Sequence, residues 1–203
     1  DTYDVSHFDD AFVQMVKDYT DKGGALIVCG ASDYQDTADV QTSKEMNKIL
    51  TAIGATTRMN SDQVQDAAKN EKEPYRLSLK NFNADSKYLK GAFADSTDEE
   101  GNKIEGQEYS TYRGCSVALD ADAVTAGKAE PLVSGFDTTS SVDCKDENGG
   151  SVSNNPTVVE AGKVVSLGHE TLTSGADVFV AGTVFMSDYE VRAEEDTVKP
   201  FLN

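Results

Sequence analysis

The feature that most limits the fold is a short apolar segment enclosed by glycines. Ala25-Leu-Ile-Val-Cys29 follows the pair Gly23-Gly24 and stops at Gly30. A continuous apolar run of this length is typical of a strand that is buried on both faces of a parallel sheet. Apolar side chains recur at helical spacing from Phe8 to Tyr19, so a helix should lead into this strand. The sequence therefore predicts a helix-to-strand unit of an α/β fold.

The remaining elements follow from the same periodicities. A second helix is expected from Thr42 to Ile53, and a brief helix should follow a cap at 60–62. Gly182, inside the last apolar run, is expected to mark a close approach of another segment. The last two runs should be neighbouring strands. Strands are predicted at 55–59, 75–79, 108–119, 164–167 and 178–186.

A single domain spanning residues 1–203 is expected, because a chain of this length can bury one core. The polar stretches 81–106 and 137–156 are predicted to be insertions that form loops or hairpin tips. The first residues are similar to the end of a strand. We therefore expect that a β-α unit belongs upstream of residue 1 and is missing here.

The charge balance excludes two classes of partner. The chain has 36 acidic and 18 basic residues, a net charge of -18. Such a field repels nucleic-acid phosphates and anionic lipids, so no nucleic acid is expected as a partner of this domain alone. No apolar run is long enough to cross a bilayer, so no membrane insertion is expected. An acidic surface suits an extracellular or cell-surface protein. No cofactor is expected, and the alternative is Ca²⁺, which carboxylates bind.

Polar residues follow the first predicted strand directly, and four of them are candidates for ligand binding: Ser32, Asp33, Tyr34 and Asp36. In open α/β sheets, ligands bind at the carboxyl ends of the strands, which is where this loop would lie. The alternative is an ordinary loop whose Asp and Ser side chains accept hydrogen bonds from local backbone amides.

The three cysteines lack the spacing of a zinc site. Cys115 and Cys144 flank a polar stretch and are the pair expected to form a disulfide if the protein is exported. Asp143 and Asp146 are the candidates for a Ca²⁺ site, although they do not keep the order of an EF-hand loop.

No catalytic residue is expected. The side chains that could act in catalysis if this expectation is wrong are Cys29, His169 and Glu170. Cys29 is not part of a strained nucleophile turn, and apolar neighbours should raise the pKa of its thiol. His169 and Glu170 are adjacent on a predicted strand, so their side chains should point to opposite faces. They therefore cannot act together as base and orienting carboxylate without a bulge.

Several segments resemble known proteins. The stretch from Tyr19 to Asp33 resembles the helix-Gly-Gly-strand-Gly-x-Ser-Asp segment of class I glutamine amidotransferase-like domains, especially their ThuA-like and GldG-like branches. Gly182-Thr-Val-Phe-Met-Ser-Asp188 is similar to the last-strand segment of the GldG-like group. Four short segments also resemble a module of large secreted proteins of Gram-positive bacteria, at 33–36, 53–58, 74–76 and 185–190.

The resemblance implies a flavodoxin-like three-layer sandwich with a mostly parallel sheet and polar insertions. It also implies that Ser187 and Asp188 join the ligand-binding edge. The motifs G-x-C-x-G and H-x-E do not occur. The implied domain has therefore lost amidotransferase catalysis and binds a glycan, a peptide or a neighbouring domain of the same polypeptide.

Three functions stay open from the sequence. The first is a non-catalytic binding or interaction module of an exported multidomain surface protein. The second is a hydrolase that works through Cys29 or through the carboxylates of Asp33 and Asp36. The third is a scaffold that positions a secreted nuclease or phosphoesterase domain in the same polypeptide.

Overall fold

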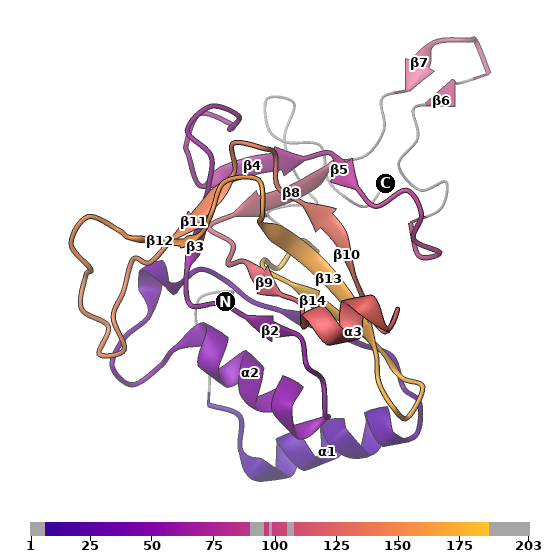
Figure 1. The fold of residues 1–203 in the computed structure, drawn as a ribbon, viewed down its shortest axis with the longest axis vertical. Helices are drawn as coiled ribbons and strands as arrows, with labels where there is room; N and C mark the ends of the chain where they lie inside the picture. Colours follow the sequence, from indigo (N-terminus) through magenta and orange to yellow (C-terminus); the bar gives the residue numbers. More distant parts are fainter. Residues whose placement is uncertain (1–6, 90–95, 98, 105–107, 187–203) are drawn as a thin grey trace.

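The computed structural model describes residues 7–89, 96–97, 99–104 and 108–186. Short strands make up most of the regular structure in these residues. The helices α1 and α2 lie next to each other at one end of the molecule (Figure 1). The helical segments are α1 (Asp10–Asp21), α2 (Thr42–Ala52), α3 (Ala121–Thr125) and a 3-10 turn at Asp33–Gln35.

The largest sheet has five strands in the order β1-β14-β13-β10-β5. Within it, β1 and β14 are parallel, whereas the other three pairs are antiparallel. Strands β1 and β5 therefore form the two edges. The strands are β1 (Leu26–Cys29), β14 (Asp177–Ala181), β13 (Val165–Thr171), β10 (Ala129–Ser134) and β5 (Asn81–Phe82).

The predicted flavodoxin-like three-layer sandwich with a mostly parallel sheet is wrong, because the fold is mostly β with mixed and antiparallel sheets. The two last apolar runs are neighbours, as expected, but only the turn around 172–176 separates β13 from β14. A parallel pair would need a crossover of a dozen or more residues. Strand β1 has a parallel neighbour, as predicted, but the predicted burial on both of its faces is wrong, because β1 is an edge strand and Ile27 is 48% exposed. An apolar run also does not fix the direction of the neighbouring strand.

In the described part of the chain, the other strands form one three-stranded sheet and three pairs. The three-stranded sheet has the order β12 (Thr157–Val159), β11 (Ser140–Val142) and β3 (Gln63–Gln65). The pairs are β2 (Arg58–Met59) with β9 (Val117–Ala118), β4 (Arg76–Leu79) with β8 (Tyr109–Tyr112), and β6 (Ser96–Thr97) with β7 (Lys103–Ile104).

Two local predictions change in this part of the fold. The brief helix expected after residues 60–62 is wrong, because residues 63–65 form β3. The polar stretch 137–156 contains β11, and the stretch 81–106 begins with β5 of the largest sheet. Both stretches therefore contribute strands as well as loops.

Apolar side chains pack on both faces of the five-stranded sheet. Successive residues of a strand point to opposite faces, so Val180 and Ala181 belong to different clusters. Val180 packs with β1 and with Leu50 of α2. The second cluster lies on the other face and includes Ala181, Leu167, Leu77, Leu132 and Tyr109.

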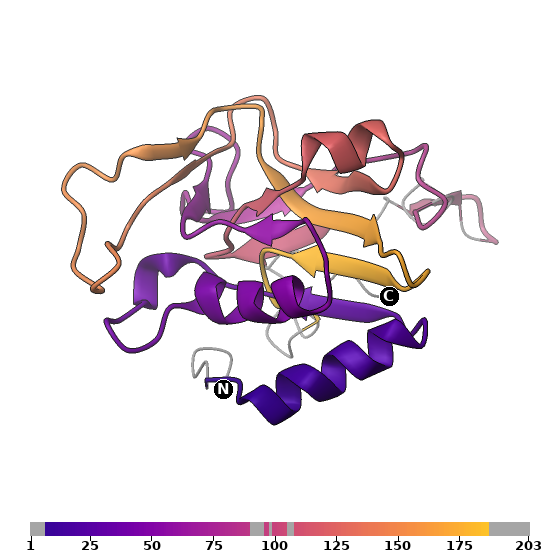
Figure 2. The same ribbon diagram turned by 60° about the horizontal axis from the view of Figure 1, so that its bottom comes forward.

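Helix α1 confirms the first element predicted from the sequence. The carboxylate of Asp9 caps it by accepting a hydrogen bond from the Phe12 backbone N–H at 2.7 Å. Gly23, in the left-handed conformation with φ of 84°, follows its end. Figure 2 shows α1 beside β1, at one edge of the sheet. Among the described residues, no helix is long and apolar enough to cross a membrane.

Candidate functional site

The loop that follows β1 meets two other segments of the chain. The Ser32 N–H donates to the carbonyl of Arg113 at 2.7 Å, and the Cys115 N–H donates to the carbonyl of Gly182 at 2.8 Å. A Cβ placed on Gly182 would lie 1.9 Å from the Cys115 carbonyl oxygen. The close approach predicted at this glycine is therefore confirmed. The loop with the candidate ligand-binding residues lies at this junction.

Asp33 is an interior residue of this junction, with 1% of its surface exposed. Its Oδ2 accepts hydrogen bonds from the backbone N–H groups of Cys144 at 2.8 Å and Lys145 at 3.1 Å. Burial raises the pKa of the carboxyl to about 6, and the charge of nearby Asp143 also raises it. The two backbone hydrogen bonds act in the opposite direction and lower the pKa. Asp33 therefore ties the segment at 143–145 to the loop after β1.

Two further candidates are buried, and one is exposed. Asp36 Oδ1 accepts hydrogen bonds from the backbone N–H and the hydroxyl of Thr42 at the start of α2, both at 3.0 Å. Burial raises the pKa of this carboxyl. Ser32 is also buried, whereas Tyr34 is 45% exposed. For Asp33 and Asp36 the geometry matches the alternative in which loop carboxylates satisfy backbone amides.

Tyr34 belongs to a group of four side chains that we call the tyrosine-arginine cluster: Tyr34, Tyr75, Tyr112 and Arg113. The guanidinium carbon of Arg113 lies 3.9 Å from the ring centroid of Tyr34 and 4.6 Å from that of Tyr75. The rings of Tyr75 and Tyr112 meet edge to face at 5.6 Å. These distances are typical of cation-π and aromatic contacts.

The sequence does not single out the tyrosine-arginine cluster, because its members come from three separate segments. The backbone brings them together: the Arg113 N–H donates to the Tyr75 carbonyl at 2.9 Å, and Arg113 has a positive φ of 49°. Two of the four arginines of the chain, Arg76 and Arg113, lie over the Tyr112 ring. The one signal for this cluster in the sequence is that each of these two arginines directly follows a tyrosine.

The prediction that Asp62 caps a helix is wrong, because a strand follows it. It is fully buried and accepts hydrogen bonds from the Ser116 backbone N–H at 2.7 Å and from the hydroxyls of Ser116 and Ser141 at 2.5 Å each. Burial raises the pKa of its carboxyl. Asp62 connects the segment before β3 to the segment before β9 and to β11.

His169 and Glu170 point to opposite faces of β13, as predicted. The Nε2 of His169 lies 2.9 Å from Asp177 Oδ1, and its Nδ1 lies 3.7 Å from Glu130 Oε1. Because both ring nitrogens face carboxylates, neither is directed at a thiol. The Tyr88 ring packs on His169 at 4.3 Å between centroids. The histidine therefore links neighbouring strands of the sheet.

The three cysteines are free thiols, so the disulfide predicted between Cys115 and Cys144 is not formed in the structure. Both side chains are buried, and they belong to different parts of the junction. Burial raises the pKa of the Cys144 thiol to about 12 and that of Cys29 to about 11. A thiol with so high a pKa is almost entirely protonated at neutral pH and is a weak nucleophile.

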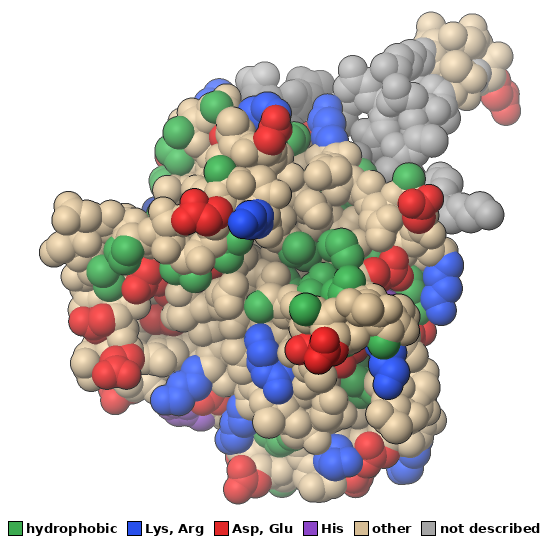
Figure 3. Space-filling model, viewed as in Figure 1, with side chains coloured by type: hydrophobic (Ala, Val, Ile, Leu, Met, Phe, Trp, Pro, Cys, Tyr) green, Lys and Arg blue, Asp and Glu red, His purple; other side chains and the backbone are tan. Residues whose placement is uncertain are grey.

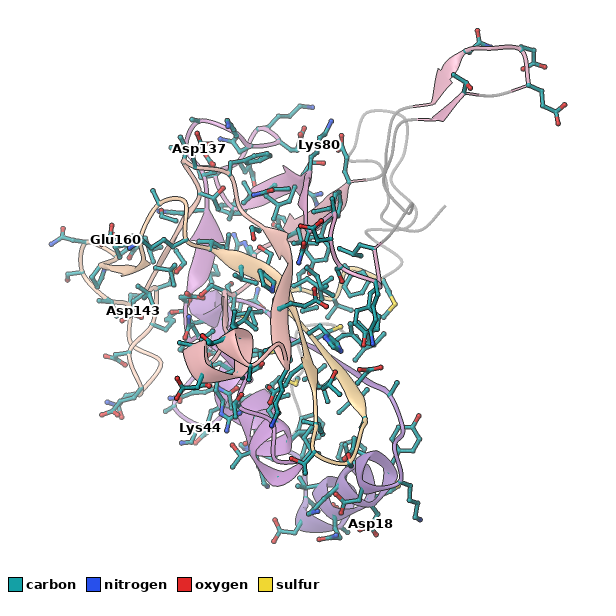
Figure 4. The ribbon with its side chains drawn as sticks, turned by 45° about the vertical axis from the view of Figure 1, so that its right-hand side comes forward. Asp18, Lys44, Lys80, Asp137, Asp143 and Glu160 are labelled. Carbon is teal, nitrogen blue, oxygen red and sulfur yellow. The ribbon has the colours of Figure 1, made fainter. Side chains whose placement is uncertain are left out.

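The candidates for Ca²⁺ binding have other partners. Asp146 Oδ1 accepts hydrogen bonds from the backbone N–H groups of its own turn, and Asp143 (Figure 4) lies beside Asp33. In the described part of the chain, no group of three or more His, Cys, Asp or Glu side chains could hold a metal ion. Ser187 and Asp188 lie outside the described residues.

An open groove of about 940 Å³ runs along α2. Its walls are α2, the segment 59–61 and the loop tip at 147–148, and most of its lining side chains are polar. Small-molecule sites are predominantly apolar, so this groove lacks their usual character. Acidic and basic side chains are interspersed on the face of the molecule shown in Figure 3.

The chain was also compared with known proteins. No protein-family model matches it, and no curated protein does. A solved structure of similar fold is the mmIFT52 N-terminal domain, with a TM-score of 0.55 and 14% sequence identity over 94% of this chain and 67% of that chain. At this identity the match shows a shared fold alone. Nothing in these comparisons supports the glutamine amidotransferase-like module, so that interpretation is corrected.

Proposed function

We propose that this chain is a non-catalytic binding module of an exported multidomain surface protein and that the tyrosine-arginine cluster is its contact surface. The observation that carries the proposal is the Arg113 guanidinium, 3.9 Å from the ring centroid of the exposed Tyr34. Tyr and Arg are enriched among the residues that contribute most binding energy at protein interfaces. The ligand we propose is a polypeptide, either a peptide or a neighbouring domain.

Preorganisation of the cluster favours this role. Tyrosine side chains have two rotatable torsions and present a large area, so ordering them costs little conformational entropy. The Arg113 backbone is held on both sides, by Tyr75 through its N–H and by Ser32 through its carbonyl. A cluster whose geometry exists before the ligand arrives loses less free energy on binding.

The hydrolase alternative has less support in the geometry. Cys29 has a thiol pKa of about 11, and the carboxylates of Asp33 and Asp36 are buried and hydrogen-bonded to backbone amides. A catalytic carboxylate must reach its substrate within hydrogen-bond distance. The scaffold alternative is a special case of the binding module, in which the bound polypeptide is an adjoining enzyme domain.

The proposal is tested by probing a random peptide library and a glycan array with the purified protein. We expect peptides to be captured, and Tyr34→Ala to weaken their binding about tenfold or more, as for an interface residue that contributes over 1.4 kcal/mol. Tyr34 is exposed, so this substitution should leave the fold intact. The matched control is Val158→Ala, which changes a similarly exposed apolar residue on β12.

Two outcomes contradict the proposal. Capture of glycans without peptides would overturn the assignment of a polypeptide ligand. Equal peptide binding by the wild type, Tyr34→Ala and Arg113→Ala would remove the tyrosine-arginine cluster from the interface. Circular dichroism of each variant establishes that a loss of binding is not a loss of folding.

A further inference from the structure

Among the described residues, strand β1 pairs with a neighbour on one side only. In a parallel ladder, every second residue turns its backbone N–H and C=O toward the partner strand. The Gly30 N–H donates to the Ala181 carbonyl, so the residues that face β14 are those in step with Gly30. Leu26 and Val28 direct their backbone groups at β14. The N–H and C=O groups of Ile27 and Cys29 consequently point away from the sheet, and they make no hydrogen bond to any described residue.

Apolar side chains flank this open edge. Ile27 is 48% exposed and lies on the face of the sheet that is opposite to α1 and α2. Helix α1 lies beside β1 (Figure 2) and exposes three large side chains in one stripe: Phe12, Met15 and Tyr19. The ring of Tyr19 covers Gly24, two residues before β1.

These two features define what fits the edge. Unpaired N–H and C=O groups in a row are matched by the backbone of another extended strand. Its side chains would alternate between two faces, one toward the apolar stripe of α1 and one beside the single half-exposed side chain of Ile27. The residues that face α1 should therefore be apolar, and those on the more solvated face should be polar.

Charge decides between the possible strands. Residues 9–22 carry four aspartates and two lysines, a net charge of -2, and the whole chain carries -18. Asp18 lies on α1 (Figure 4) and accepts a hydrogen bond from Gln14 without a cationic partner among the described residues. A second copy would bring the same acidic helix to the edge, and like charges oppose that contact. A segment with basic ends is complementary.

We propose that the open edge of β1 is a second interaction site, which binds an extended, basic segment of a partner protein by strand addition. It is independent of the tyrosine-arginine cluster. The partner segment alternates apolar and polar residues and carries Lys or Arg at its ends.

The test uses the ¹⁵N-labelled protein and a synthetic seven-residue peptide of alternating valine and threonine with a lysine at each end. At saturation, amide exchange should slow about tenfold or more at Ile27 and Cys29, whose N–H groups the added strand would bond. The matched peptide with a glutamate at each end should bind about tenfold more weakly.

Two substitutions separate this site from other causes. Ile27→Pro removes one outward N–H and leaves the ladder to β14 in place, and proline is tolerated on the open side of an edge strand. Ile27→Lys keeps the N–H and adds a charge that opposes the basic peptide. Both should lower the affinity for the lysine-ended peptide about tenfold or more, whereas Tyr34→Ala should not change it.

Each of three results would overturn the inference. The first is that millimolar peptide leaves exchange at Ile27 and Cys29 unchanged. The second is that both Ile27 variants bind the peptide as the wild type does. The third is that these two amides are already protected in a concentration-dependent manner, which would assign the edge to a second copy of the chain.

Discussion

Replacement of Glu170 by alanine should destabilise the protein strongly. Its carboxylate accepts hydrogen bonds from the Thr57 N–H at 2.8 Å and from the Thr56 N–H at 2.9 and 3.0 Å. Thr57 is fully buried, so its N–H would be left unsatisfied, at a cost of about 1–3 kcal/mol. Thr56 is exposed and can turn to water, so its bonds add about 1 kcal/mol. The expected loss is about 2–4 kcal/mol.

Urea unfolding measures this loss. At a slope of about 2 kcal/mol per molar, the Glu170→Ala midpoint should fall by about 1–2 M. Glu170→Gln keeps one acceptor oxygen and should lose roughly half as much. The control is Glu160→Ala (Figure 4), an exposed carboxylate whose removal should change stability by less than about 0.5 kcal/mol. A loss below about 1 kcal/mol for Glu170→Ala would refute the structural role derived for this residue.

Three other outcomes follow from burial. Burial raises the pKa of the Asp33 carboxyl from 3.8 to about 6 in the folded protein. The folded protein therefore binds the carboxyl proton more tightly than the unfolded chain does, and loss of this proton at higher pH lowers the stability of the fold. Asp33→Asn should therefore exceed the wild type in stability at pH 7 by about 2–3 kcal/mol, and the difference measured by urea unfolding should shrink, not grow, as the pH falls through 6 toward 4. Ellman's reagent should label the three thiols slowly in the native protein and yield three equivalents after denaturation without reductant, whereas one equivalent would reveal a disulfide. Gly182→Ala should lower the thermal midpoint more than Gly175→Ala does, because the Cβ at 182 would lie 1.9 Å from the Cys115 carbonyl oxygen, whereas the Cβ at 175 meets nothing within 4 Å and adds only the strain of a positive φ of 83°. Equal midpoints would contradict the close approach at Gly182.

The candidate site illustrates the limits of sequence reasoning. The loop at Ser32–Asp36 was correctly placed at the end of a strand, yet three of its four candidates are buried. Whether a loop carboxylate faces a ligand or a backbone amide depends on segments far along the chain. For Asp33 the partners are Cys144 and Lys145, more than 100 positions away. No local pattern contains that information.

The local elements, in contrast, were determined by the sequence alone. The spacing from Phe8 to Tyr19 and the apolar run at Ala25–Cys29 predicted α1 and β1, because helix and strand periodicities are properties of neighbouring residues. Gly182 likewise predicted a close approach of another segment, which is that of Cys115. These signals depend on backbone geometry over a few residues.

Only the tertiary structure decided how the strands pair and which side chains reach the surface together. An apolar run is equally compatible with a parallel or an antiparallel neighbour, so the sequence left open that β14 has β1 on one side and β13, in the opposite direction, on the other. Tyr34, Tyr75 and Arg113 come from separate segments and meet through backbone hydrogen bonds between them. Strand partners and surface clusters are contacts between distant residues, and these form only when the whole core has closed.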